Sequence, residues 1–257
     1  MEKRTLAIRS KGVPRNHRTI DRVTRILEEV VYHPGMTFAD LTRALDAPRS
    51  SVHGFIRGLL AKGWLYEDDH RFYLGPAVYG LTMVSGHIRA GLVTHADLAA
   101  LYEESGVAAF LGVQAGDHVI NIDEAGADPL VGFAARRNIR RTMLATAGGK
   151  ALLASRPQSE RDAFLRRRGP DEAEQVEQFL AEYESIKKTG IARNTLYAGK
   201  RFAIATTVKN QAGQVVAETT LVGASEDVLP REAELSELLI RHVNSWRERS
   251  VNPREAI

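Results

Sequence analysis

The sequence contains no cysteine, which excludes a disulfide framework and a cysteine-ligated zinc or iron–sulfur site. Its eight histidines are scattered, and none stands three or four residues from another, the spacing of a helical metal site. Long hydrophobic runs are also missing: no stretch approaches the roughly 18 apolar residues of a membrane span, and the basic N-terminus lacks the apolar segment of a signal peptide. We therefore expect a cytoplasmic protein without a metal or a cofactor.

The 257 residues are 44% hydrophobic, which is enough material for two domains with real cores. The net charge of +3 is unevenly distributed, because residues 1–74 hold 13 Lys and Arg against 9 Asp and Glu, and the remainder holds 22 against 23. The excess is steepest in residues 1–25. Such a basic segment is either a solvated tail or an arm that contacts nucleic-acid phosphates.

The stretch 37–74 contains three consecutive signals of a DNA-reading domain. Thr37 can cap a short helix with Asp40 three residues on, and the apolar positions of this helix share one face. Pro48 suits the first position of a second helix, whose apolar residues recur at i, i+3, i+4, i+7 and i+8. Gly63 ends that helix, and residues 64–67 and 71–74 are typical of two short strands joined by a charged turn. This order predicts a winged helix-turn-helix.

The outer face of the second helix carries small and hydrogen-bonding residues, which leave room for a base edge or a phosphate. We expect phosphates to be held by Arg49, Arg57 and Arg71. The full set of residues predicted to contact DNA is Thr37, Arg49, Ser50, Ser51, His53, Gly54, Arg57 and Arg71.

The pattern predicts four regions: a basic arm (1–18), the winged helix-turn-helix domain (19–75), a helical linker (76–105) and a second domain (106–257). The first domain begins with a helix over 19–32. Its predicted inward positions are Ile20, Val23, Ile26, Leu27, Val30 and Val31. The linker contains two helices, over 77–90 and 94–105. Their apolar surface fits either a dimer contact or ordinary packing on the second domain.

The second domain combines hairpins with helices, without strict strand–helix alternation, and this favours an antiparallel α+β fold. The predicted strands cover residues 107–113, 119–122, 130–135, 202–208 and 215–222. The predicted helices cover residues 145–155, 159–167, 171–189 and 231–249. On the fourth strand Ala203 and Ala205 share a face, which allows close approach of a helix or a ligand. On the last strand Thr220 and Val222 share a face with Val216 and Glu218.

One loop-to-helix transition, residues 142–150 (TMLATAGGK), carries most of the chemistry of this domain. Small residues at a helix start leave N–H groups exposed, and the helix dipole there favours an anion such as a carboxylate. A turn that needs glycine only for close packing is the alternative. A nucleotide-binding P-loop is disfavoured, because Leu144 stands where its first glycine belongs and Ala151 replaces the magnesium-binding Ser or Thr. Of four preceding arginines (136, 137, 140, 141), one can reach an anionic ligand, or all can form a solvated face.

Several segments together resemble the IclR family of bacterial transcriptional regulators across residues 19–247. They are Ala39-Asp40-Leu41, Ser50-Ser51-Val52-His53, Gly63-Trp64-Leu65, Phe72-Tyr73-Leu74-Gly75 and the run Ala145 to Ala154. The resemblance implies a homodimer, or a tetramer built as a dimer of dimers, that binds double-stranded operator DNA. It also implies a profilin-like or GAF-like C-terminal domain that binds a small metabolite, commonly a carboxylate. Carried over position by position, the family's pocket corresponds to Met143, Ala147, Gly148, Ala192, Phe202, Thr220 and Val222.

Some positions depart from the family pattern. Gly54 replaces a longer polar residue in the middle of the reading face, so recognition must rest on its neighbours. The segment after Gly190 lacks the usual acidic residues, and its following strand lacks the usual proline. Thr220 and Val222 stand where two serines are common. This more apolar lining predicts a larger or aromatic effector, or a weakened carboxylate site.

Two other functions compete with that of a regulator. An enzyme built on the second domain is not expected, because the chain has no Gly-x-Ser-x-Gly elbow and no His/acid pair at fixed spacing. A winged helix that binds protein, or a ligand sensor without specific DNA binding, remains the alternative.

Overall fold

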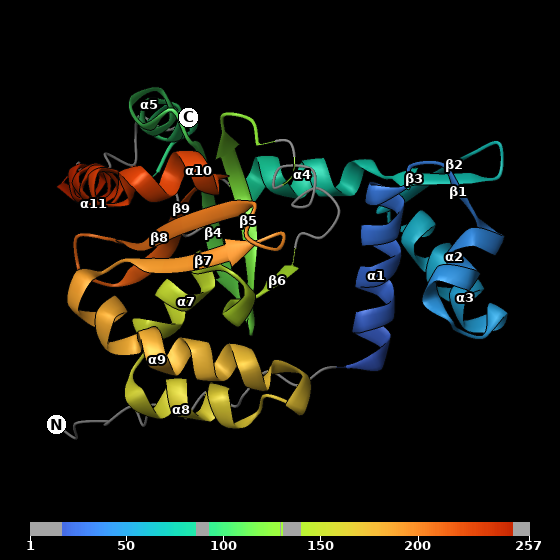
Figure 1. Cartoon of the computed structure of the whole chain (residues 1–257). Helices are drawn as coiled ribbons and strands as arrows, with labels where there is room; N and C mark the ends of the chain where they lie inside the picture. Colours follow the sequence, from blue (N-terminus) through green and yellow to red (C-terminus); the bar gives the residue numbers. More distant parts are fainter. Residues whose placement is uncertain (1–16, 86–92, 129, 131–139, 249–257) are drawn as a thin grey trace, which may run out of the picture. The chain divides into compact units, whose positions relative to one another are not determined.

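The computed structural model describes residues 17–85, 93–128, 130 and 140–248. The chain divides into two compact units, residues 1–86 and 87–257, and each is described by itself (Figure 1). The basic arm before residue 17, most of the predicted strand 130–135, Arg136 and Arg137 lie outside the described residues. In the described part of the chain, no helix is long and apolar enough to cross a membrane.

The first unit is a winged helix-turn-helix, as predicted, with a small antiparallel sheet in the order β1-β3-β2. Its elements are α1 (Arg18–Tyr32), β1 (Met36–Thr37), α2 (Phe38–Leu45), α3 (Arg49–Ala61), β2 (Leu65–Asp68), β3 (Arg71–Leu74) and α4 (Pro76–Ser85). Strand β1 was not predicted, because two residues are too short for a periodic signal. Pro48 is the residue that precedes α3 and not its first helical residue, so that prediction was wrong by one position.

The start of α2 is fixed by the predicted capping pair. The Thr37 hydroxyl oxygen accepts a hydrogen bond from the Asp40 backbone N–H (3.3 Å), and the Asp40 carboxylate accepts one from the Thr37 N–H (3.0 Å). These bonds satisfy two N–H groups that a helix start leaves without partners. The Thr37 hydroxyl also donates a hydrogen bond to the Asp40 carboxylate (2.6 Å), which is the largest cause of a lowered pKa of Asp40, followed by the bond from the Thr37 N–H.

The core of the first unit joins α1, α2 and α3 to the wing through Ile26, Leu41, Val52, Ile56 and Phe72. Two positions predicted to face inward are exposed instead, Ile20 at 60% and Val31 at 46%. With about 3.6 residues per turn, both lie roughly a third of a turn away from Ile26, at the edge of the apolar stripe. The width of the buried stripe was therefore overestimated.

The second unit is built on a six-stranded antiparallel sheet in the order β6-β5-β4-β9-β8-β7, which confirms the α+β prediction. The strands are β4 (Ala108–Ala115), β5 (His118–Ala125), β6 (Arg140–Thr142), β7 (Ala192–Leu196), β8 (Arg201–Lys209) and β9 (Val215–Ala224). Strands β6 and β7 were not predicted. Their charged residues hide the alternating pattern, and they occupy the two edges of the sheet.

Helices cover both faces of this sheet (Figure 1). One face packs against α5 (His95–Ser105) and α11 (Glu232–Glu248), and the other against α7 (Ala147–Ala154), α8 (Gln158–Arg166) and α9 (Ala173–Thr189). Helix α10 (Ser225–Val228) follows β9, and short 3₁₀ turns cover Met143–Ala145, Pro170–Glu172 and Leu229–Arg231. The predicted helix over 145–155 corresponds to α7, which begins two residues later, after the 3₁₀ turn.

Alternation along β8 separates the two cores. Phe202 and Ile204 belong to the core under α11, whereas Ala203 and Ala205 belong to the core under α7. The prediction that the alanine face admits a close helix is confirmed, because small side chains let α7 lie directly on the strand.

Candidate functional site: an exposed helix face and a buried cavity

The outer face of α3 is exposed, as a DNA-reading surface requires. Arg49, Ser50, His53, Gly54 and Arg57 are exposed, and Ser51 is half-buried. An added Cβ at Gly54 would meet no heavy atom within 4 Å, so this face has a flat centre between longer side chains.

Phe38 of α2 supports one end of this face. The Arg49 guanidinium lies 5.8 Å from the centre of the Phe38 ring, and the His53 ring meets the same ring edge-on at 6.0 Å. Such contacts hold the two polar side chains in place without consuming their hydrogen-bonding groups.

The other two residues predicted to contact DNA have structural bonds of their own. Thr37 caps α2, as described above. Arg71, on the wing, donates a hydrogen bond from Nη1 to the Gly35 carbonyl oxygen (2.9 Å). A guanidinium has five N–H donors, so this bond leaves others for a phosphate.

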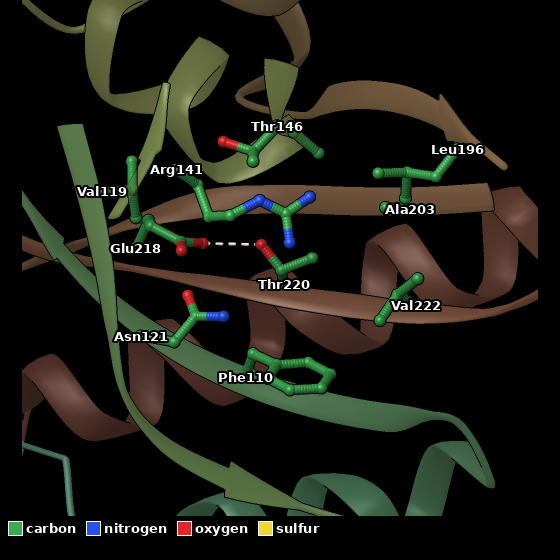
Figure 2. A pocket seen from close by; sticks show the side chains of 11 residues that line it. Phe110, Val119, Asn121, Arg141, Thr146, Leu196, Ala203, Glu218, Thr220 and Val222 are labelled. Carbon is green, nitrogen blue, oxygen red and sulfur yellow. Dashed lines mark hydrogen bonds between the residues drawn. The ribbon is translucent and has the colours of Figure 1, made fainter. Parts of the chain in front are cut away.

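In the second unit, a cavity lies between the sheet and the start of α7 (Figure 2). Its volume is about 50 Å³, which is room for roughly four water molecules. Every strand of the sheet contributes to it. The lining residues are Phe110, Val119, Asn121, Arg141, Thr146, Ala147, Leu196, Ala203, Glu218, Thr220 and Val222.

Three residues that the family resemblance assigned to a pocket line this cavity: Ala147, Thr220 and Val222. Met143 and Ala192 are instead fully buried in the core under α7. Phe202 points to the opposite face of the sheet, into the core under α11, and β8 contributes Ala203 to the cavity in its place. The strict alternation of a strand makes Phe202 and Ala203 mutually exclusive on one face.

Gly148 has no side chain, and the space that this leaves is occupied by the Glu218 carboxyl group. A Cβ at this position would lie 2.1 Å from Cδ of Glu218, and one at Gly112 would lie 2.1 Å from its Oε1. The two glycines therefore make room for a single carboxyl group. Gly149 serves packing alone, because a Cβ there would lie 2.2 Å from the Met143 carbonyl oxygen.

Glu218 is the most unusual residue of the site. It is 2% exposed, and its carboxylate accepts a hydrogen bond from the Thr220 hydroxyl (2.6 Å; Figure 2). Burial raises the pKa of Glu218 to about 7, and the bond from Thr220 opposes that rise. Within the part of the chain that the structure describes, no cation lies within 4.0 Å of this carboxyl group.

The polar groups that face the cavity come from three other elements. Arg141 of β6 extends into it, Asn121 of β5 lines the side near Phe110, and Thr146 precedes α7 (Figure 2). The Thr146 hydroxyl accepts a hydrogen bond from the Gly149 N–H (3.0 Å). Of the two arginines before the loop that the structure describes, Arg140 and Arg141, it is Arg141 that lines the cavity.

Comparisons with known proteins agree with this architecture. The sequence profile of the IclR helix-turn-helix domain matches residues 19–69. The HTH-type transcriptional regulator BhcR of Paracoccus denitrificans is 29% identical, in an alignment that covers 58% of this chain and 59% of that protein. Residues 19–69 thus match the IclR helix-turn-helix domain, and the chain is similar to a curated regulator of that type.

Solved structures of IclR-type proteins share the fold of both units. An IclR regulator from Alicyclobacillus acidocaldarius matches with a TM-score of 0.68 at 18% identity, covering 91% of this chain and 100% of that one. An IclR homologue from Microbacterium hydrocarbonoxydans, complexed with 4-hydroxybenzoate, matches with a TM-score of 0.70 at 18% identity, covering 89% and 97%. The alignment with BhcR spans only about three fifths of that protein, 59% of its length.

The lysine of the IclR-like Ala-Gly-Gly-Lys run has a structural role. Lys150 is 2% exposed, and its ammonium donates to both carboxylate oxygens of Glu182 (3.2 and 3.1 Å) and to the Arg193 carbonyl oxygen (3.0 Å). These bonds tie α7 to α9 and β7. The ammonium is buried and bonded within the protein, so it is not presented to a phosphate at the surface.

Sequence reasoning did not assign Glu218 to the cavity, nor its neighbours Asn121 and Phe110. A signal for Glu218 was present, because it shares a strand face with Thr220 and Val222. Its environment depends on the sheet register, which pairs Gly112 with both Glu218 and Asn121. Among residues 17–85, 93–128, 130 and 140–248, no three His, Asp or Glu side chains gather in a metal-binding group.

Proposed function

We propose that this chain is a DNA-binding transcriptional regulator of the IclR type, whose affinity for operator DNA is set by a small molecule in the cavity of its second unit. One observation carries the DNA part: residues 49–57 of the matched helix-turn-helix present a continuous polar and basic face to solvent. An α-helix of this kind fits the major groove, where side chains reach base edges and phosphates.

In this proposal Arg49 and Arg57 hold phosphates, and Ser50, Ser51 and His53 face the bases. Gly54 makes no side-chain contact with DNA. Because it has no side chain, the backbone of α3 can lie closer to the floor of the groove. Arg71 adds a wing contact, and Thr37 holds the start of α2. The active species is a homodimer, or a dimer of dimers, with one recognition helix per half-site.

The effector is a small organic acid; the apolar lining suits an aromatic acid, for which the cavity of about 50 Å³ has to widen on binding. Arg141 supplies the cation for a carboxylate, and Phe110, Val119, Leu196 and Val222 supply apolar surface. A protein of the same fold has been crystallised with 4-hydroxybenzoate, which is a precedent for this class of ligand. No catalytic step is part of the proposal.

DNA binding is tested with a random duplex and a salt series. Wild type is expected to bind with an affinity that falls steeply with salt, because phosphate contacts release counterions. Arg49→Ala and Arg57→Ala are expected to weaken binding and to reduce the salt slope by about one each. Arg166→Ala removes an exposed charge from α8 and serves as the control. Unchanged affinity in both α3 variants would reject this surface, and no binding even at low salt would favour a protein-interaction module.

A further inference from the structure

The start of α7 was expected to receive an anion from a ligand, yet the protein places its own carboxyl group there. Carboxyl atoms of Glu218 fill the space over Gly148, within 2.1–2.4 Å of where a Cβ would stand. The N-terminal end of a helix favours negative charge. The carboxyl group of Glu218, from β9, therefore already occupies the anion position at the start of α7.

This arrangement is built into the backbone on both sides of the carboxyl group. Gly112 of β4 lies opposite Glu218 in the sheet register, and a Cβ there would collide with Oε1. Without these two glycines the acid could not lie flat against α7. Glu218 consequently lies at the cavity wall and is almost fully buried.

The groups packed around Glu218 do not neutralise it. Thr220 donates one hydrogen bond to it, while Asn121 and Val119 of β5 and Thr146 before α7 are uncharged. Arg141 of β6 is the charged group that shares the cavity, and it does not come within 4.0 Å of the Glu218 carboxyl group. The cavity thus contains a cation and a separate acid that no protein contact joins.

We propose that Glu218 selects effectors that carry two groups: a carboxylate for Arg141 and a hydrogen-bond donor, a hydroxyl or amino group, for Glu218. This inference rests on the proposed function, since it names the chemical class of ligand for the same cavity. A buried carboxylate with one hydrogen bond has further lone pairs to satisfy, and a donor on the ligand satisfies them. A simple acid without a donor leaves them empty.

The same geometry disfavours plain carboxylates. A second carboxylate in a cavity of about 50 Å³ would lie close to Glu218, and like charges at short range in a buried site repel. This repulsion acts on every acid in the cavity, and a donor-bearing ligand offsets it with a hydrogen bond to the ionised Glu218, whereas a donor-free acid does not.

Matched probe pairs test the inference by calorimetry and thermal shift at pH 8. Propionate is paired with lactate and with alanine, and benzoate is paired with 4-hydroxybenzoate and with 4-aminobenzoate. The first member of each pair lacks the donor and the second carries it. In wild type, the donor-bearing acid of at least one pair is expected to bind about 10-fold or more tightly than its donor-free partner. This is the scale of a hydrogen bond to a charged group. The preference is expected to shrink at pH 5, where Glu218 is protonated.

Glu218→Leu removes the acceptor and is expected to abolish the preference, while Glu226→Leu, at an exposed position on α10, leaves it intact. Glu218→Gln keeps the side-chain shape, so it remains informative if the leucine variant does not fold; it is expected to reduce the preference for donor-bearing probes. Equal affinities within every pair in wild type, or a preference that survives in both Glu218 variants, would overturn the inference. Binding of no probe would contradict the effector cavity itself and this inference with it, while the DNA result would stand.

Discussion

The carboxyl group of Glu218 occupies the space that a side chain at Gly148 would need, so the first turn of α7 and the middle of β9 fit together only because residue 148 is glycine. This contact joins the glycine-rich run, whose role was open between ligand binding and packing, to the wall of the cavity. Both glycines are required for packing: Gly149 by the backbone of Met143, and Gly148 by an acidic side chain that lines the cavity. Ligand binding by this run stays a prediction.

Gly148→Ala is expected to destabilise the fold by about 1–3 kcal/mol, the usual cost of overpacking a core. In a Glu218→Ala background the sign reverses, because the clash is gone and alanine is the better helix former by roughly 0.5–1 kcal/mol. Urea denaturation of the two single variants and the double variant measures this. Equal effects of Gly148→Ala in both backgrounds would show that the two residues do not compete for space.

Stability is expected to depend on pH through Glu218. Its folded pKa is raised from 4.5 to about 7, so the folded state holds a proton that the unfolded chain releases, and stability falls as pH rises between these values. The penalty above pH 7 is about 3 kcal/mol. Glu218→Gln is therefore expected to be more stable than wild type at pH 8, and nearly equal to it at pH 5.

Urea titrations at pH 5, 6, 7 and 8 measure this pH dependence, and Glu226→Gln on the surface is the control. A difference between Glu218→Gln and wild type that does not change with pH would mean that Glu218 titrates normally.

Gly54→Ala is expected to stabilise the first unit by about 0.5–1 kcal/mol, because glycine in a helix interior costs that much relative to alanine. The new methyl group meets open space. Gly58→Ala, one turn further along α3 and equally open, is expected to give the same gain in thermal unfolding. Since neither change alters a charge, the salt slope of DNA binding should stay constant. A loss of stability in either variant would contradict the helix geometry.

Lys150→Met is expected to destabilise the second unit by about 1–3 kcal/mol, because the Arg193 carbonyl oxygen and the Glu182 carboxylate lose their shared donor. Glu182 keeps some contact with water, which limits the cost. Lys188→Met, at an exposed position on α9, is the control. Magnesium and ATP are not expected to raise the melting temperature of wild type. A nucleotide-dependent rise that Lys150→Met removes would restore a phosphate-binding role.

Much of the first unit could be predicted from the sequence because its signals are local. The pairing of Thr37 with Asp40 and the apolar stripe of α3 depend on residues within a few turns of each other. Where a prediction needed tertiary context, as for the exposure of Ile20, periodicity alone gave the wrong answer. The periodicity of apolar residues shows which side of a helix faces the core. How wide the buried side is depends on the elements that pack against the helix.

The cavity could be predicted only in part for the same reason. Thr220, Val222 and Ala147 followed from the family resemblance, and the alternation of β8 gave the small Ala203 face. Glu218 could not be placed without knowing that Gly112 lies opposite it and Gly148 lies above it, since these three residues are far apart in sequence. An acid in a strand is ordinarily solvent-exposed, and only the fold shows that this one is buried.

Coupling between the cavity and operator DNA tests the central claim most directly. Wild type can be used to select its own binding fragment from genomic DNA, and the Kd for that fragment can then be measured by fluorescence anisotropy with and without the best-binding probe. We expect the probe to change this Kd by about 5-fold or more, the usual scale of allosteric coupling, and to leave the Kd of Glu218→Leu nearly unchanged. A Kd that is the same with and without a probe shown to bind the cavity would contradict the account.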